Sequence, residues 1–294
     1  MDKRPDILIG AADLFSWKDC RNWVKSAQAS GFTGEIWIIA YRVDADIAIE
    51  ATKLGVNMYP VEHDPYLNPI THAAKGSPTQ SHNLRFYHFW ELLARLDADK
   101  YRYVIATDVR DCIFQNNPSD YLIDLHNKSM RDSYKDPFII APSEGLQFKN
   151  EPWNRQNLMD SYGQNFYDLN NCGEWIAANV GTIAGTAELM RDTFHTLYAM
   201  TEGREKHPSD QATFNILIHS LLTPIFLDMS QGWAIQAGTT LDISKSYLWN
   251  NVLPGEMPYI RDGIAYTGNG GRAVLFHQYD RIPGLKEIID ERYA

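Results

Sequence analysis

The chain has 294 residues, of which 44% are hydrophobic and 22% charged, a composition typical of globular proteins. This length suits one large α/β domain and is ample for a well-buried core. The net charge of −10 argues against nucleic acid or an anionic membrane surface as the partner, because phosphate binding needs clustered Lys and Arg. An acidic protein still binds a nucleoside diphosphate when a metal ion or a local arginine offsets the charge.

No stretch reaches the roughly 18 uninterrupted apolar residues that a membrane helix needs. The apolar run near the N-terminus is short and is interrupted by Asp13, unlike that of a signal peptide. We therefore expect no membrane insertion and a cytoplasmic location. Cys20, Cys112 and Cys172 show no paired spacing, so we expect small core residues rather than a disulfide framework or a zinc cluster.

In the first half of the chain, apolar and β-branched runs alternate with segments of helical period. The predicted strands are residues 6–10, 35–40, 57–61 and 103–107, and the predicted helices are residues 17–30, 45–54 and 81–96. This alternation indicates βαβ units and a mostly parallel sheet flanked by helices. Ligands of such sheets bind at the carboxyl ends of the strands, so chemistry is expected after the first and fourth strands.

The second half of the chain is less regular. The predicted strands are residues 138–141, 180–184 and 274–277, and the predicted helices are residues 186–201 and 209–221. Residues 144–154 and 249–259 read as long loops, a kind of segment that is usually functional or disordered. Several aromatic residues here suit stacking on sugar faces, although each could instead anchor the core or a loop: Trp153, Tyr162, Trp175, Trp233 and Trp249. No composition change marks a domain boundary.

The strongest motif is YVIATDVRDCIF, residues 103–114. Asp108 and Asp111 follow a buried strand and can point into one crevice. There they would bind a hard divalent cation that keeps open positions for phosphate oxygens. The alternative is a turn with a capping aspartate and a surface Asp–Arg pair. A phosphohydrolase with an aspartyl nucleophile is excluded, because Arg110 occupies the position of its second carboxylate.

Three weaker motifs accompany it. A short apolar strand delivers His277, whose imidazole could complete the metal site or serve as a structural hydrogen-bonding group. In the segment SDQATFN, Asp210 and Gln211 could face a reacting sugar, or the segment could only cap a helix. In NVGTIAG, Asn179 precedes a strand, and Gly181 would let the backbone approach a ligand.

Taken in order, the motifs DVRD, NVG, SDQATFN and FHQYDR resemble the GT-A glycosyltransferases, especially glycogenin- and galactosyltransferase-like enzymes. They are also similar to relatives that share a TDVRD…DQ…HQYDR pattern. The resemblance runs from the first strand to residue 281. It implies a Rossmann-like α/β fold with a mostly parallel central sheet, in a single domain of residues 1–294. The N-terminal half would bind the nucleotide and the C-terminal half the acceptor.

The resemblance also implies roles for individual residues. Asp111 would bind the metal ion, with Asp108 as its partner or as a ribose contact, and His277 would complete the site. The residues implied to contact the donor are Ala11, Ala12 and Asp13 at the nucleoside, Arg85 at the phosphates, and Asn179, Gly181, Asp210 and Gln211 near the sugar. Two departures stand out: the carboxylates are spaced DxxD rather than DxD, and the Lys-Pro-Trp tail after the late histidine is replaced by residues 282–284, with Lys286 as a weak substitute.

The implied activity is a metal-dependent sugar transfer from a nucleotide sugar to a carbohydrate or other hydroxyl acceptor, with Mn²⁺ or Mg²⁺ as cofactor. Asp210 would be the base of an inverting reaction. In a retaining reaction Asp210 or Gln211 would steady the positive charge on the sugar. Two alternatives are an inactive carbohydrate-binding protein of the same fold and a sugar nucleotidyltransferase. The latter usually has a Gly-rich, basic loop after its first strand, where this chain has GAADLFSW with Lys18 as the nearby cation.

Overall fold

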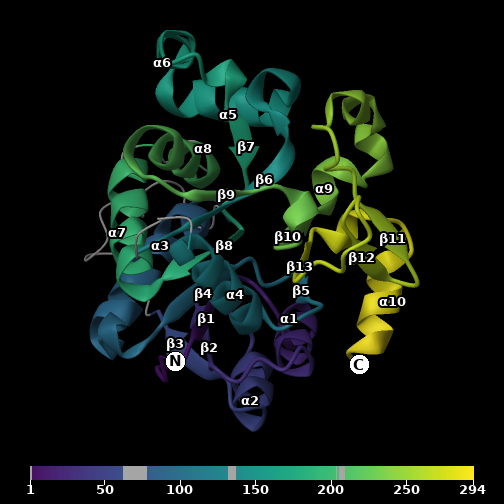
Figure 1. Cartoon of the computed structure of the whole chain (residues 1–294). Helices are drawn as coiled ribbons and strands as arrows, with labels where there is room; N and C mark the ends of the chain where they lie inside the picture. Colours follow the sequence, from purple (N-terminus) through teal and green to yellow (C-terminus); the bar gives the residue numbers. More distant parts are fainter. Residues whose placement is uncertain (1, 62–77, 132–136, 203, 205–208) are drawn as a thin grey trace.

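The computed structural model describes residues 2–61, 78–131, 137–202, 204 and 209–294 (Figure 1). Its centre is a five-stranded sheet in the order β3-β2-β1-β4-β8, in which β8 alone runs antiparallel to its neighbour. The strands are β1 (Ile7–Ala12), β2 (Glu35–Ala40), β3 (Asn57–Pro60), β4 (Tyr103–Thr107) and β8 (Thr182–Thr186). The predicted α/β fold with a mostly parallel central sheet is confirmed.

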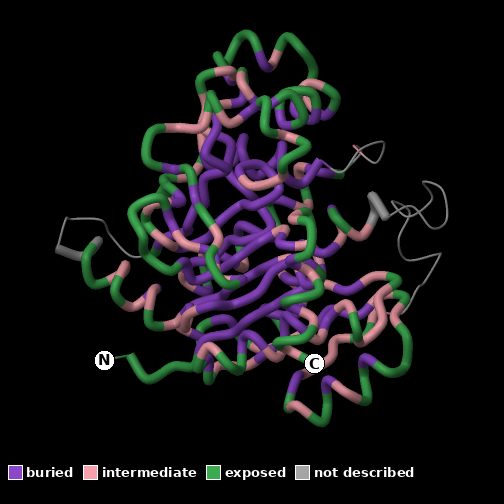
Figure 2. The backbone as a smooth tube through the Cα atoms, turned by 90° about the vertical axis from the view of Figure 1, so that its right-hand side faces the viewer, coloured by how far each residue is buried: buried purple, intermediate pink, exposed green. Residues whose placement is uncertain are grey.

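Helices cover both faces of this sheet. Successive side chains of a strand point to opposite faces, so Leu8 packs in the cluster that contains Trp23, and Ile9 packs in the cluster that contains Phe89. The first face carries α1 (Trp17–Ala29), α2 (Ala45–Lys53) and α4 (Pro118–Arg131); the second carries α3 (Pro78–Leu96) and α7 (Ala187–Thr201). Figure 2 shows the buried backbone as a continuous band between these layers.

Two smaller sheets extend the central one. In the order β7-β6-β9, the strands are β7 (Ile176–Ala178), β6 (Ile140–Gln147) and β9 (Ile225–Leu227). In the order β10-β13-β5, they are β10 (Ala234–Gln236), β13 (Leu275–His277) and β5 (Cys112–Phe114). A hairpin pairs β11 (Tyr259–Arg261) with β12 (Ile264–Tyr266). The remaining α-helices are α5 (Pro152–Tyr162), α6 (Gln164–Leu169), α8 (Asp210–Ile216), α9 (Ala237–Thr240) and α10 (Leu285–Arg292).

Residues 144–154 are not the loop that the sequence predicts. Strand β6 continues to Gln147, and a short 3-10 turn then leads into α5. The side chain of Glu151 caps α5, and Pro152 occupies its first turn, where a proline is well tolerated. The prediction was wrong because α5 has no one-sided apolar stripe, so its sequence lacks the helical period. Residues 252–258, within the second predicted loop, do lack helix and strand.

The predicted strand 138–141 corresponds to β6 but ends six residues too early, and the other predicted elements agree with the structure to within a few residues at each end. The predicted helix 209–221 consists of α8 and a π-helical turn at Leu217–Leu221. Cys20, Cys112 and Cys172 are free and buried, as expected of core residues. Among the described helices, none has both the length and the apolar character that crossing a membrane requires.

Candidate active site

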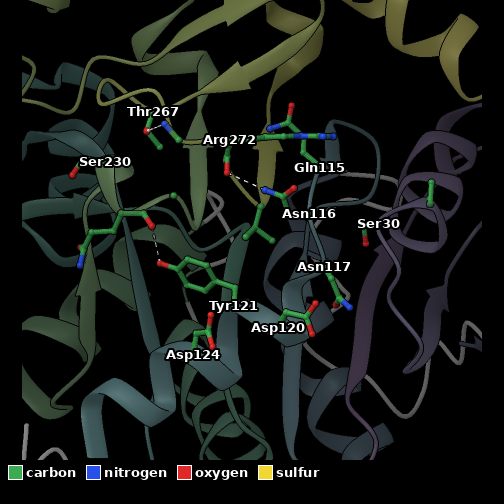
Figure 3. Close-up of a pocket in the computed structure, with 15 residues that line it drawn as sticks. Ser30, Gln115, Asn116, Asn117, Asp120, Tyr121, Asp124, Ser230, Thr267 and Arg272 are labelled. Carbon is green, nitrogen blue, oxygen red and sulfur yellow. Dashed lines mark hydrogen bonds between the residues drawn. The ribbon is translucent and has the colours of Figure 1, made fainter. Parts of the chain in front are cut away.

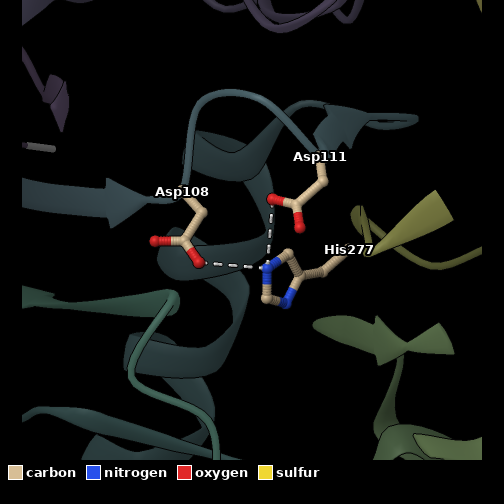
Figure 4. A group of neighbouring side chains, drawn as sticks. All are labelled: Asp108, Asp111 and His277. Atoms are coloured by element: carbon tan, nitrogen blue, oxygen red, sulfur yellow. Dashed lines mark ion pairs between the residues drawn. The ribbon is translucent and has the colours of Figure 1, made fainter. Parts of the chain in front are cut away.

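Two carboxylates and an imidazole meet at the carboxyl end of the central sheet. Asp108 and Asp111 lie in the turn between β4 and β5, and His277 is the last residue of β13. Strands β13 and β5 pair antiparallel with His277 opposite Cys112, and the Gln278 amide donates to the Asp111 carbonyl at 2.6 Å. This pairing joins two segments far apart in the chain. One ligand atom from each residue lies within 4.8 Å of the others (Figure 4).

The imidazole of His277 is oriented by a residue that the sequence analysis did not single out. Its Nδ1 lies 2.7 Å from the Gln236 side-chain oxygen, and Gln236 Nε2 donates to the Thr182 hydroxyl at 2.8 Å. In this arrangement the Gln236 side-chain oxygen faces His277 and its NH₂ group faces the Thr182 hydroxyl. Nδ1 therefore carries the proton of a neutral imidazole, and the lone pair of Nε2 points toward the two carboxylates.

These three side chains fit a divalent cation. His277 Nε2 lies 3.3 Å from Asp108 Oδ2 and 3.6 Å from Asp111 Oδ1, and it makes no regular hydrogen bond to the described residues. His277 is 1% exposed, so in the neutral imidazole the lone pair of Nε2 is buried beside two carboxylates, as in a metal ligand. Oxygen ligands with one imidazole suit Mn²⁺ and related ions.

The protonation of these groups reflects their mutual charges. Burial alone would lower the pKa of His277, but the charges of Asp111 and Asp108 outweigh it and raise that pKa to about 10. Burial alone would raise the pKa of Asp108, but the charges of Arg85 and His277 hold it far below its usual range. In the metal-free protein, a proton on His277 thus compensates part of the acidic charge.

Arg85, on α3, links the metal-binding turn to α8. Its guanidinium pairs with Asp108 through Nη1 and donates from Nη2 to Asp210 Oδ2 at 3.0 Å. These ion pairs are poorly solvated, because Arg85 is 8% exposed and Asp210 is 6% exposed. A buried arginine flanked by two carboxylates is held in one orientation. The structure therefore brings together three residues that the sequence analysis assigned to metal, phosphate and sugar.

A buried carboxylate next to these linked ion pairs was missed by the sequence analysis. Glu144, on β6, is 5% exposed and accepts three hydrogen bonds from side-chain amides. The donors are Asn154 Nδ2 at 2.6 Å, Asn179 Nδ2 at 2.8 Å and Gln211 Nε2 at 2.9 Å. The one signal in the sequence is a glutamate that interrupts an otherwise apolar and small-residue run, IAPSEGLQ. We call Glu144, Asn154, Asn179 and Gln211 the amide network.

The amide network fixes the orientation of its members. A carboxylate only accepts, so the NH₂ group of Gln211 faces Glu144, and it also donates to Asn154 Oδ1 at 2.9 Å. The Gln211 side-chain oxygen, Oε1, therefore points away from Glu144 and accepts a hydrogen bond from the Val180 backbone amide at 3.3 Å. By the same reasoning, Asn179 Oδ1 accepts from the Gly181 amide at 2.8 Å.

Gly181 joins the amide network to the metal-binding turn. A Cβ atom at this position would lie 2.5 Å from Asp108 Oδ2 and 3.0 Å from Asn179 Oδ1, which is closer than such atoms approach. The sequence analysis expected Gly181 to admit a ligand. In the structure the glycine makes room for the Asp108 carboxylate, whose own backbone amide donates to the Gly181 carbonyl at 2.9 Å, and the approach of a ligand here stays a prediction.

The residues implied at the nucleoside lie at the same edge of the sheet. Ala11 and Ala12 end β1, which is parallel to β4 and adjacent to it. Asp13 follows and forms an ion pair with Arg42 at 2.6 Å. Their role at the donor stays a prediction. Lys286 is engaged on its own helix by Asp290 at 2.7 Å.

A polar cavity of about 560 Å³ lies at the other end of the β5–β13 pair (Figure 3). Several of its polar side chains are already held by backbone carbonyls: Tyr121 donates to Gln231 and Asn116 to Arg272. Its lining includes Asp120 and Asp124 of α4, but it includes no residue of the metal group, neither Arg85 nor Asp210, and no member of the amide network. This cavity is therefore separate from the metal group.

Neither a family model nor a curated protein sequence matches the chain. Among solved structures, the apo form of mouse xyloside xylosyltransferase 1 is similar, with a TM-score of 0.50 and 14% identity. The match covers 93% of this chain and 97% of that one. At this identity the likeness concerns the fold. The central sheet, its flanking helices and the match over nearly the whole chain establish that this protein has the GT-A fold of glycosyltransferases.

Proposed function

We propose that the protein is a metal-dependent glycosyltransferase that moves a sugar from a nucleotide-diphosphate donor to a hydroxyl acceptor. The observation that carries the proposal is the meeting of Asp108, Asp111 and His277 at the carboxyl edge of a GT-A sheet. Ligands of open α/β sheets bind at this edge. The Mn²⁺ or Mg²⁺ ion, the donor and the acceptor are parts of the proposal.

Glycosyl transfer breaks the bond between an anomeric carbon and a diphosphate, and negative charge develops on the departing phosphate. A cation held by the two aspartates and His277 would supply a Lewis acid for that charge. His277 serves this purpose because the Gln236 side-chain oxygen, 2.7 Å from its Nδ1, leaves Nε2 facing the carboxylates. Arg85 adds a fixed positive charge between the metal-binding turn and Asp210.

On the sugar side, the proposal gives separate tasks to Asp210 and Gln211. Asp210 Oδ2 accepts a hydrogen bond from Arg85, and Asp210 Oδ1 accepts one from the Gln211 backbone amide at 2.9 Å. The carboxylate is thus fixed and keeps lone pairs for hydroxyl groups. In an inverting reaction Asp210 takes the acceptor proton. In a retaining reaction the Gln211 carbonyl oxygen, turned away from Glu144, stabilises positive charge on the sugar ring. The anomeric configuration of the product distinguishes the two.

The test is metal-dependent release of free nucleotide from a panel of UDP-, GDP- and dTDP-sugars, with Mn²⁺ or with chelator. We expect one donor to be hydrolysed slowly, and chelator or Asp111→Asn to abolish the reaction. Asp124→Asn is the matched control, because Asp124 is an exposed carboxylate in the separate cavity. Equal rates in Asp111→Asn and Asp124→Asn would contradict the proposed metal site.

A second assay separates the alternatives. A sugar nucleotidyltransferase would consume a nucleoside triphosphate with a sugar 1-phosphate and release pyrophosphate. An inactive carbohydrate-binding protein would do neither reaction. Failure of every donor, together with no Mn²⁺-dependent thermal shift by UDP, GDP or dTDP, would refute the proposed function.

A further inference from the structure

An indole ring lies open to solvent next to the buried amide network. Trp153, in the first turn of α5, is 52% exposed, whereas the next residue, Asn154, is 2% exposed and donates to Glu144. Trp233, by contrast, is fully buried. An exposed tryptophan presents a large apolar face with a polar edge, which is a feature of binding surfaces rather than of cores.

The backbone that carries Trp153 is held firmly. Glu151 precedes it as the N-cap of α5 and accepts a hydrogen bond from the Asn154 backbone amide at 2.5 Å. The Asn154 side chain is anchored on its other side by the amide network, since its Oδ1 accepts from Gln211 at 2.9 Å. Trp153 therefore sits between two anchored residues, and its position relative to Gln211 is fixed by the scaffold. A ring on an anchored backbone loses less conformational entropy when it binds a ligand than a ring on a mobile loop.

A second element rises beside α5. The 3-10 segment η7 (Ile243–Asn251) follows α9, and both are tied to β6 immediately after Glu144. The Leu253 amide donates to the Gly145 carbonyl at 2.8 Å, and a Cβ on Gly145 would lie 3.6 Å from the Thr240 methyl group. In Figure 1, the α5–α6 pair and the coil after α9 both project beyond the same end of the molecule.

The N-cap of α5 is a glutamate with a shifted pKa, and η7 carries a second exposed aromatic residue. Burial and the charge of Glu144 raise the pKa of Glu151, and the charge of Lys245 on η7 acts in the opposite direction. Tyr247, two residues further along η7, is 64% exposed. Both α5 and η7 thus carry an exposed aromatic ring, Trp153 and Tyr247.

We propose that Trp153 is the platform on which an acceptor sugar stacks, and that the acceptor is therefore a pyranoside. This inference rests on the proposed function, because it places the acceptor beside the residues given to the donor sugar. The C–H face of a pyranose covers the apolar face of an indole, while its hydroxyl groups reach carboxylate and amide partners. Two observations support it: Trp153 is exposed, and it directly precedes Asn154, a member of the amide network.

The experiment compares the full-length wild type with Trp153→Ala and Trp153→Phe. Leu169→Ala is the matched control, because Leu169 is 86% exposed on the adjacent helix α6. Saturation-transfer NMR measures binding of the methyl glycosides of glucose, galactose, mannose and xylose, with Mn²⁺ present. Where a donor is turned over, the same glycosides are used as acceptors, and acceptor-independent hydrolysis of the donor is recorded in parallel.

We expect at least one glycoside to bind the wild type, with its ring C–H protons receiving the most saturation. Trp153→Ala should raise the dissociation constant or the KM for this glycoside by about tenfold, as truncation of an aromatic anchor does. Trp153→Phe should retain most of the binding, and donor hydrolysis should be unchanged in both.

Two results would overturn this inference: no glycoside binds the wild type, or Trp153→Ala binds and transfers as well as Leu169→Ala. The proposed function fails independently. If glycoside binding depends on Trp153 but no donor is hydrolysed, the sugar platform stands and the transferase activity does not.

Discussion

The substitution Glu144→Gln tests whether the amide network positions Gln211. Glutamine has nearly the shape of glutamate, but one of its terminal atoms becomes an NH₂ donor. If this NH₂ replaces Oε2, it faces the NH₂ of Asn154; if it replaces Oε1, it faces those of both Asn179 and Gln211. Rotation of Asn154 would not relieve the conflict, because its oxygen already accepts from Gln211. At least one donor is left without an acceptor.

The expected cost follows from these contacts. Hydrogen bonds to charged groups contribute about 1.5–3 kcal/mol each, and a buried unsatisfied donor costs about 1–3 kcal/mol. Loss of one bond should lower the free energy of unfolding by about 2–3 kcal/mol, hence the melting temperature by roughly 3–5 °C for a chain of this length. The mutant folds, yet rotation of the Gln211 amide should reduce kcat for sugar transfer at least about tenfold, with the KM of the donor changed less.

The assays are calorimetric unfolding and steady-state turnover, with Glu174→Gln as the control. Glu174 pairs with Lys149 at 2.8 Å on an exposed part of the chain, where an ion pair contributes about 0–1 kcal/mol. Wild-type stability and turnover in Glu144→Gln would refute the reasoning. A loss of stability with unchanged kcat would show that Glu144 only supports the fold.

Three further predictions concern charge and space. In Gly181→Ala the new Cβ would lie 2.5 Å from Asp108 Oδ2, so the Mn²⁺ affinity measured by calorimetry should fall at least about tenfold. The control Gly271→Ala, whose new Cβ has its nearest contact at 3.3 Å, should keep the wild-type affinity. Equal Mn²⁺ affinities of the two variants would contradict this prediction. The pKa of metal-free His277 is raised to about 10, so cation binding should release a proton, and Mn²⁺ affinity should rise up to about tenfold per pH unit below that value. Titration in buffers of different ionisation enthalpy measures this release, and its absence would be decisive against a protonated His277. Burial raises the pKa of Glu256 to about 7, with the charge of Asp228 adding to the shift. The folded state thus holds this proton more tightly than the unfolded state. The free energy of unfolding should therefore decline by about 1.4 kcal/mol per pH unit from about pH 4.5 to 7. Urea unfolding at a series of pH values measures this slope, and Glu256→Gln should remove it.

The site residues that could be predicted from the sequence are those that end or directly follow a recognisable strand. Asp108 and Asp111 follow a strand whose five residues are all buried, and His277 ends another, so their place at the edge of a sheet could be inferred. Gln236 ends a strand of three residues and carries no motif. Its contact with His277 arises from the parallel pairing of β10 with β13, which the sequence does not specify.

Glu144 could not be predicted for a related reason. Its neighbours include Pro142 and Gly145, which argue against a regular strand, and β6 indeed has a register shift between Ser143 and Gln147. The partners of Glu144 come from three other segments of the chain: α5, the residue after β7, and α8. Sequence patterns describe local structure well, but they do not specify which buried polar groups will satisfy one another across the fold.

The antiparallel pairing of β13 with β5 has a consequence for synthesis of the protein. The strands that hold Asp108 and Asp111 emerge from the ribosome early, whereas His277 and the Gln278 amide that bonds to Asp111 emerge much later. A nascent chain can therefore complete its central sheet before its metal-binding residues are together. A polypeptide that ends between residues 111 and 276 keeps both aspartates but lacks the imidazole, so such incomplete chains should accumulate without metal-dependent activity.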